Sequence, residues 1–167
     1  MEKKELLLQL EKEHDQIREM LQKLSISIMI EDVERFKKLL VNFDQIIGPH
    51  FRFEEEAVYP ALVDIYYPGY ISKLYTDHDL AIARFNELKN LVNKEKFSES
   101  DYISGIRHVR MMGHYITGCE ILPIKNIPLD DQQIKRLKTL HKKSKEEKLG
   151  LISWSGTRRN RKQLYFI

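Results

Sequence analysis

The chain has 167 residues, of which 42% are hydrophobic and 32% are charged, and its formal net charge is +3. This length suffices for one domain with its own core, and the lack of an apolar run of about 18 residues argues against a membrane span. The single cysteine, Cys119, excludes a disulfide within the chain and favours a reducing compartment, so we expect the cytoplasm.

Residues 2–24 have the pattern of an amphipathic helix. Apolar side chains recur at spacings of three and four residues, at Leu7, Leu10, Ile17, Leu21 and Leu24. His14 lies in the middle of this apolar stripe, whereas Glu13 is expected on another face of the helix. The first helix therefore offers one inward histidine.

A second helix is predicted from about residue 32 to the mid-60s. Its apolar stripe consists of Val33, Phe36, Leu40, Phe43 and Ile47. The stripe continues into His50 and Glu54. Gly48-Pro49 interrupts the pattern directly before His50, which predicts either a kink or a boundary between two shorter helices.

His50 and Glu54 are four residues apart, so a helix places the imidazole and the carboxylate side by side on its apolar face. A carboxylate in an apolar stripe costs several kcal/mol unless it is neutralised, and a bound cation is the simplest partner. The alternative is a partly exposed His–Glu pair at the edge of a helix.

Two more helices each carry a histidine in the apolar stripe. Residues 70–96 are predicted to form the third helix, with His78 on its inner face. Residues 99–122 are predicted to form the fourth, where His114 lies near the inner side of a weaker stripe. His108, on the same helix, is expected at the surface.

The carboxyl-terminal part of the chain is basic. A fifth helix is predicted to begin at Asp130, with His141 at the surface. From residue 135 to residue 162 there are eleven Lys or Arg and two Glu, whereas the rest of the chain sums to −6. Residues 149–167 lack periodicity and are expected to form a flexible or partner-dependent tail.

The pattern contains no strand-type alternation, so the predicted fold class is all-α. Long helices joined by short turns predict an antiparallel up-down-up-down four-helix bundle, with an additional C-terminal basic helix and a tail. We expect the bundle to occupy residues 1–148 and the basic tail to occupy residues 149–167.

The four inner stripes would bring His14, His50, His78 and His114 to one axis if the helices face each other at similar depths. Four imidazoles with at least one carboxylate form a mixed nitrogen and oxygen ligand set, which suits iron, manganese or zinc. A single core histidine is more often satisfied by a neighbouring carbonyl or hydroxyl. Four of them, one per helix, favour a metal site.

These residues resemble the hemerythrin-like, or HHE, cation-binding domain. The resemblance rests on His14, the run His50-Phe51-x-x-Glu54-Glu55-x-x-x-Tyr59-Pro60, His78 and His114, and it covers about residues 5–145. It implies a four-helix bundle with a non-haem di-iron site that binds dioxygen, nitric oxide or iron. By matching position, the four histidines would be ligands and Glu54 a bridging carboxylate.

Two positions depart from that family's pattern. Ile82 stands where the oxygen-carrying hemerythrins have a further histidine, which favours redox or sensing chemistry over oxygen carriage. Gly118 and Cys119 stand where a second carboxylate is expected, and Glu120 reaches the site only if a π-bulge absorbs one residue. Otherwise the site is mononuclear, degenerate or supplied by Glu55. We therefore expect two irons, or one metal if Glu120 does not coordinate.

Three classes of function follow. The leading hypothesis is an iron-binding protein that binds or senses dioxygen, nitric oxide or iron. The second is an enzyme that repairs iron–sulfur centres or performs peroxide or nitric oxide redox chemistry. The third is a nucleic-acid or protein-binding module that uses the basic C-terminus, although lysine-rich terminal helices are mostly solvated faces. No membrane partner is expected.

Overall fold

The computed structural model describes residues 2–117, 125–157, 159 and 161, and this part of the chain contains helices and no strand. The helices are α1 (Glu2–Met29), α2 (Val33–Phe53), the π-helix η1 (Glu54–Val58), α3 (Tyr59–Leu62), α4 (Pro68–Lys89), α5 (Glu99–Thr117), α7 (Asp131–Glu146) and α8 (Leu151–Ser155). None of these described helices is long and apolar enough to cross a membrane. The predicted all-α class is confirmed.

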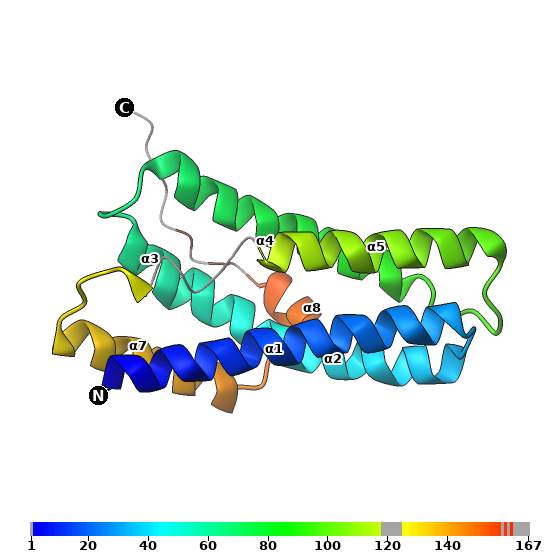
Figure 1. The fold of residues 1–167 in the computed structure, drawn as a ribbon, viewed down its shortest axis with the longest axis horizontal. Helices are drawn as coiled ribbons and strands as arrows, with labels where there is room; N and C mark the ends of the chain where they lie inside the picture. Colours follow the sequence, from blue (N-terminus) through cyan, green and yellow to red (C-terminus); the bar gives the residue numbers. More distant parts are fainter. Residues whose placement is uncertain (1, 118–124, 158, 160, 162–167) are drawn as a thin grey trace.

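The four longest helices lie side by side along the long axis of the molecule (Figure 1). Consecutive ones run in opposite directions, so α1 is followed by a returning α2, and α4 by a returning α5. Helix α1 packs against both α2 and α5, and α4 packs against α5. This arrangement is compatible with a four-helix bundle.

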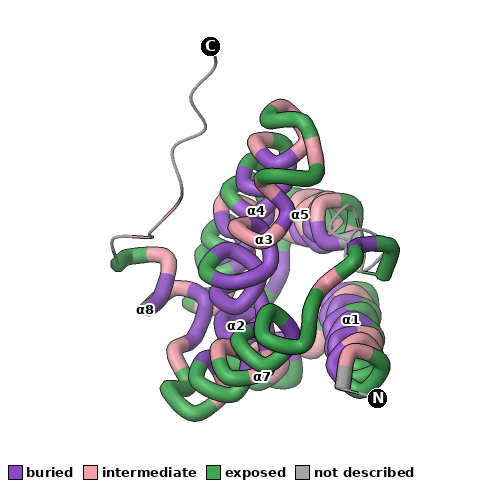
Figure 2. Tube along the Cα trace, turned by 90° about the vertical axis from the view of Figure 1, so that its left-hand side faces the viewer, coloured by how far each residue is buried: buried purple, intermediate pink, exposed green. Residues whose placement is uncertain are grey.

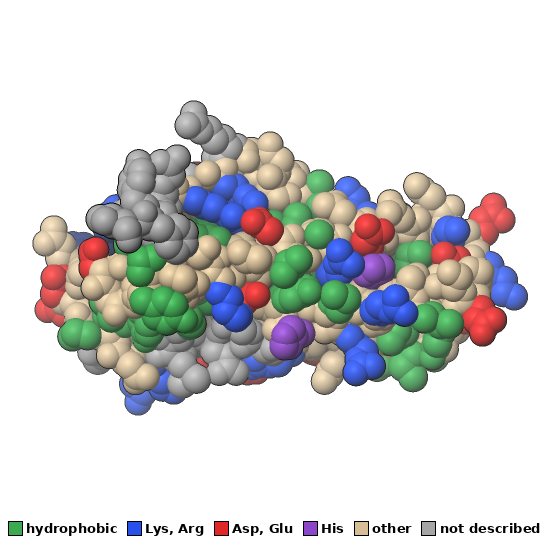
Figure 3. Space-filling model, turned by 90° about the horizontal axis from the view of Figure 1, so that it is seen from above, with side chains coloured by type: hydrophobic (Ala, Val, Ile, Leu, Met, Phe, Trp, Pro, Cys, Tyr) green, Lys and Arg blue, Asp and Glu red, His purple; other side chains and the backbone are tan. Residues whose placement is uncertain are grey.

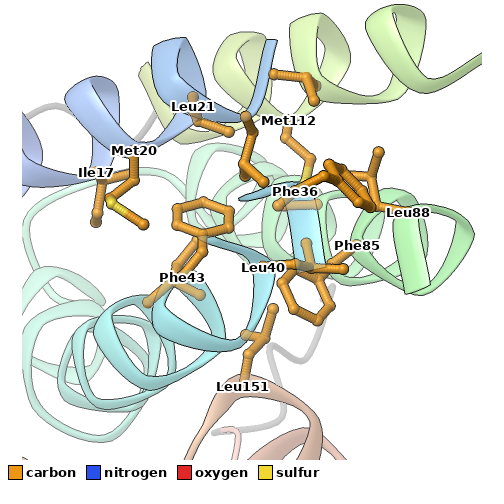
Figure 4. Close-up of a cluster of buried hydrophobic side chains, with 14 of the residues drawn as sticks. Ile17, Met20, Leu21, Phe36, Leu40, Phe43, Phe85, Leu88, Met112 and Leu151 are labelled. Atoms are coloured by element: carbon orange, nitrogen blue, oxygen red, sulfur yellow. The ribbon is translucent and has the colours of Figure 1, made fainter. Parts of the chain in front are cut away.

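The core forms where the predicted apolar stripes meet. Phe36, Leu40 and Phe43 of α2 pack with Phe85 and Leu88 of α4 in the main cluster (Figure 4). Five residues of the α2 stripe are buried as predicted, namely Val33, Phe36, Leu40, Phe43 and Ile47. A second cluster of buried side chains, including Leu10, Phe53 and Leu74, lies toward the other end of the molecule. The polar site described below lies where these two clusters adjoin.

Helix α2 continues through Gly48-Pro49, so the predicted boundary between two shorter helices is not found. Gly48 instead permits a close approach: a Cβ atom at this position would collide with the backbone of residues 149–151. Only glycine lets the chain that follows α7 pass this close to α2.

Helix α8 packs on α2, and its Leu151 and Trp154 side chains are buried in the main cluster. Asp44 of α2 fixes the start of α8, because its Oδ1 atom accepts a hydrogen bond of 3.0 Å from the Ile152 amide. The end-on view shows α1 and α8 on opposite sides of the largely buried α2 (Figure 2). Part of the segment 149–167, which was expected to be a tail, is therefore packed on α2.

Candidate metal centre

The described part of the chain contains one π turn, and it lies directly after α2, at Glu54–Val58. In this turn the Tyr59 amide donates to the Glu54 carbonyl, five residues back. Residues five apart therefore lie nearly above one another, and the side chains of Glu54 and Tyr59 face the same space. The π-bulge that was considered near Gly118 lies outside the described residues.

A first set of donor atoms comes from α1, α2 and η1. The Nε2 atoms of His14 and His50 are 3.1 Å apart. Each also faces Oε1 of Glu54, at 3.7 Å from His14 and 3.5 Å from His50. All three side chains are buried, and their donor atoms could together hold one metal ion. Metal–ligand bonds of about 2.0–2.2 Å place neighbouring donors roughly 3 Å apart, so the set fits a cation.

A second set of donor atoms surrounds the other oxygen of the same carboxylate. Oε2 of Glu54 lies 3.0 Å from Nε2 of His78. The Tyr59 hydroxyl lies 2.8 Å from the same nitrogen and 3.4 Å from Oε2. Glu54 thus lies between two donor sets, with one oxygen directed at each. Tyr59 belongs to the motif that begins at His50, but its contact with these donor atoms was not predicted.

Two further carboxylates hold the outer nitrogens of the histidine rings. Oε2 of Glu13 lies 2.9 Å from Nδ1 of His50, and Oε1 of Glu55 lies 3.1 Å from Nδ1 of His78. A carboxylate on the second ring nitrogen is the usual way in which proteins orient a metal-ligating histidine. The contacts therefore direct the Nε2 atoms of both rings toward Glu54.

The prediction that His141 lies at the surface was wrong, because its side chain is buried, and so is that of Glu13. Helix α7 packs against α1 and α2, so the face of α1 that carries Glu13 is covered. His141 contacts the Phe53 ring edge-on, and its Nε2 lies 2.7 Å from Oε1 of Glu13. Lys145 adds an ion pair of 3.0 Å to the same oxygen. The helical periodicity of α7 alone could not predict this contact, because periodicity does not show which neighbouring helix covers His141.

Arginines from the segment after α8 contact the other outer carboxylate. Arg161 donates to both oxygens of Glu55, at 2.9 and 2.7 Å, and to Asp79 at 2.8 Å. Its guanidinium also lies 4.7 Å from the centre of the Tyr75 ring. Arg159 pairs with Glu55 and Asp79 as well. Glu55 is only 2% exposed, so these cations balance a buried charge.

The buried groups shift one another's pKa values. Burial raises the pKa of the Glu13 and Glu54 carboxyl groups, but the neighbouring histidines outweigh it and hold both pKa values well below the usual range. Burial lowers the pKa of His50, yet the Glu54 and Glu13 carboxylates reverse this and raise it to about 9. Burial and the charge of His50 lower the pKa of His14 to about 4. The two facing rings therefore hold one proton between them, on His50.

His114 does not join this cluster, contrary to the prediction, and its side chain is exposed on α5. The buried residues of this helix are Gly105, Val109, Met112 and Ile116. A position two residues from both Met112 and Ile116 lies about 200° away around the helix and points outward. Figure 3 shows histidine side chains at the surface of the α4–α5 face, among lysine and arginine. Glu120 lies outside the described residues.

Comparison with known proteins identifies one family. Residues 5–112 match the hemerythrin HHE cation-binding domain, whereas no curated protein and no solved structure matches the chain significantly. The matched segment includes His14, His50, Glu54 and His78, and it ends before His114, α7 and α8. Because this match spans more than half of the sequence, the chain belongs to the hemerythrin HHE cation-binding family.

Proposed function

We propose that the chain binds two iron ions on either side of the Glu54 carboxylate. The observation that supports this is the position of that carboxylate between two donor sets, with Oε1 facing His14 and His50 and Oε2 facing His78. Its burial gives the same indication, since a buried carboxylate among imidazoles is most simply balanced by cations.

Each residue has a separate task in this proposal. His14 and His50 would hold the first ion, and His78 would hold the second together with the Tyr59 oxygen. Glu54 would provide one carboxylate oxygen to each position. Glu13 and Glu55 accept hydrogen bonds from the outer nitrogens of His50 and His78 and keep both rings in place. His114 is not a ligand in this proposal.

We further propose that the centre binds or senses dioxygen, nitric oxide or iron in the reducing cytoplasm that the single cysteine favours. Bound iron would supply a redox-active centre that accepts small diatomic ligands. Ile82 supports sensing over oxygen carriage, because this buried apolar residue offers no donor where oxygen carriers have a histidine.

A specific contact also favours the second candidate, a redox enzyme for peroxide, nitric oxide or iron–sulfur repair. The Tyr59 hydroxyl lies within hydrogen-bonding distance of His78, so a phenol that can donate a proton reaches the donor atoms. Nucleic-acid binding through the C-terminus gains no such support. Arg159 and Arg161, two of its basic residues, are already paired with carboxylates of the same chain.

The test is an anaerobic titration of the full chain with ferrous iron, followed by metal analysis and absorbance spectra after exposure to air. We expect two irons per chain and near-ultraviolet bands of oxygen-bridged iron. One iron per chain would reduce the proposal to the His14–His50–Glu54 position. No bound iron would overturn it. Decay of supplied peroxide or nitric oxide, catalysed by the loaded protein, would favour the enzyme over the sensor.

A further inference from the structure

We infer that side chains from the carboxyl-terminal part of the chain, beyond the family match, position the ligands of the metal centre without contacting the metal. Two groups of cationic or hydrogen-bonding side chains, one from α7 and one from the segment after α8, hold the carboxylates that orient His50 and His78. This inference rests on the proposed iron site and adds residues that would set its affinity.

The first group is Arg161 with Arg159. Arg161 Nε and Nη2 bind the two oxygens of Glu55 in parallel, the geometry in which a guanidinium fixes a carboxylate most firmly. Asp79, the Tyr75 carbonyl and the Tyr75 ring hold the same guanidinium from other sides. Glu55 in turn contacts Nδ1 of His78. A chain of three side chains therefore runs from the C-terminal segment to the second metal position.

The second group is His141 with Lys145, both on α7. His141 Nε2 and Lys145 Nζ share Oε1 of Glu13, at 2.7 and 3.0 Å. The other oxygen of Glu13 is used by Nδ1 of His50. Each of the two carboxylates thus contacts both a ring of the metal centre and C-terminal side chains, although Glu55 uses Oε1 for both His78 and Arg161.

The physical consequence follows from burial. Glu13 is 6% exposed and Glu55 is 2% exposed, so neither carboxylate can exchange a lost partner freely for water. If the outer partner is removed, the buried carboxylate loses part of its stabilisation and shifts toward another donor, which releases the histidine ring that it orients. Outer partners of this kind typically contribute about 10- to 100-fold to metal affinity. Arg161 and His141 are therefore positioning residues, which act through Glu55 and Glu13.

The experiment measures ferrous-iron affinity of the full chain by competition with a chromophoric chelator. Arg161→Ala is expected to lower the affinity for one of the two irons by about 10- to 100-fold. The matched control is Arg107→Ala, which removes an exposed arginine of α5. Glu55→Gln should weaken the same iron, and the double variant should be no weaker than the weaker single variant, because Arg161 acts only through Glu55.

The α7 group has its own variants. His141→Ala should weaken the other iron by a similar factor, and His141→Gln, which keeps a donor in the side chain, should restore part of the affinity. Lys142→Ala is the matched control, since Lys142 is a neighbouring exposed residue that pairs with Glu146. Combining Arg161→Ala with His141→Ala should lower the affinity for both irons, each by the factor seen in its single variant.

The possible outcomes separate this inference from the proposed function. If the unmodified chain binds no iron, the proposed function fails. If it binds two irons and Arg161→Ala and His141→Ala keep both within twofold, the inference fails. Helix content is measured by circular dichroism without metal, and Arg161→Lys serves where Arg161→Ala does not fold. Lysine keeps the charge but not the paired contacts, so we expect an intermediate affinity, and full affinity would overturn the role of Arg161.

Discussion

Glu54 and Tyr59 lie five residues apart in the sequence, yet the Tyr59 hydroxyl is 3.4 Å from Oε2 of Glu54. In a regular α-helix the two side chains would point about 140° apart. The π turn that begins at Glu54 brings them to the same side and adds a phenol to the donor atoms around Oε2. Backbone irregularity here creates part of the site.

This relationship predicts the effect of Tyr59→Phe. If the phenol oxygen binds the second iron, the variant should lose visible absorption of the tyrosinate-to-iron type and hold the second iron more weakly, while the first iron stays bound. The measurement is a spectrum of the oxidised loaded protein together with its iron content. Tyr67→Phe is the control, because Tyr67 is 71% exposed. Identical spectra for Tyr59→Phe and the unmodified chain would show that the phenol does not coordinate.

Glu54→Ala should affect both metal positions, because both use the same carboxylate. We expect less than a tenth of the normal iron content, whereas His14→Ala should lose mainly the first iron. A ligand at about 100 times its Kd stabilises the folded state by roughly 3 kcal/mol, so loss of iron should lower the Tm of the iron-treated protein by roughly 5–10 °C.

The control for these variants is His114→Ala, which removes an exposed histidine. It should keep two irons. Loss of iron in His114→Ala would show that α5 contributes to the centre after all, and retention of iron in Glu54→Ala would contradict the bridging role.

The metal-free protein should be most stable near pH 6.5. His50 has a raised pKa of about 9, so its contribution is complete below the unfolded pKa of about 6.5 and is lost as the pH rises toward 9. His14 has a lowered pKa of about 4, so its contribution is present above about 6.5 and is lost as the pH falls. The lowered pKa values of Glu13 and Glu54 add to the loss in acid.

Denaturant unfolding of the metal-free chain at a series of pH values measures this curve. Each ionisation changes the free energy of unfolding by at most about 1.4 kcal/mol per pH unit. His50→Gln should flatten the alkaline side of the curve. A free energy that rises steadily from pH 6.5 to 9 would contradict the assignment of the proton to His50.

The sequence was sufficient for the parts of the site that follow helical periodicity. His14, His50 and His78 lie in strong apolar stripes, and each is buried where its stripe predicts. His114 lies in a weak stripe, and the true inner face of α5 passes through Met112 and Ile116. Helical periodicity alone could not show which of these two faces of α5 is buried.

The contacts of the outer carboxylates Glu13 and Glu55 could not be predicted from the sequence, for a different reason. Glu13 and His141 are 128 residues apart, and whether they meet depends on how α7 packs across α1 and α2. Arg161 reaches Glu55 from a segment without any periodicity. Such contacts depend on tertiary packing, which local patterns do not encode.

Gly48→Ala tests the close contact that places the C-terminal segment. A methyl group at residue 48 would collide with the backbone of Leu149 and Leu151, which cannot move as a flexible side chain can. We expect the free energy of unfolding to fall by about 1–3 kcal/mol, as measured by denaturant unfolding of the metal-free protein.

The control is Gly113→Ala on α5, where the added Cβ would lie 3.8 Å from Leu21 Cδ1, an ordinary contact. That variant should be neutral or more stable by roughly 0.5–1 kcal/mol, because alanine is the better helix residue. If both variants gain stability equally, α2 and the start of α8 do not pack as closely as described, and the route by which Arg159 and Arg161 return to Glu55 would differ.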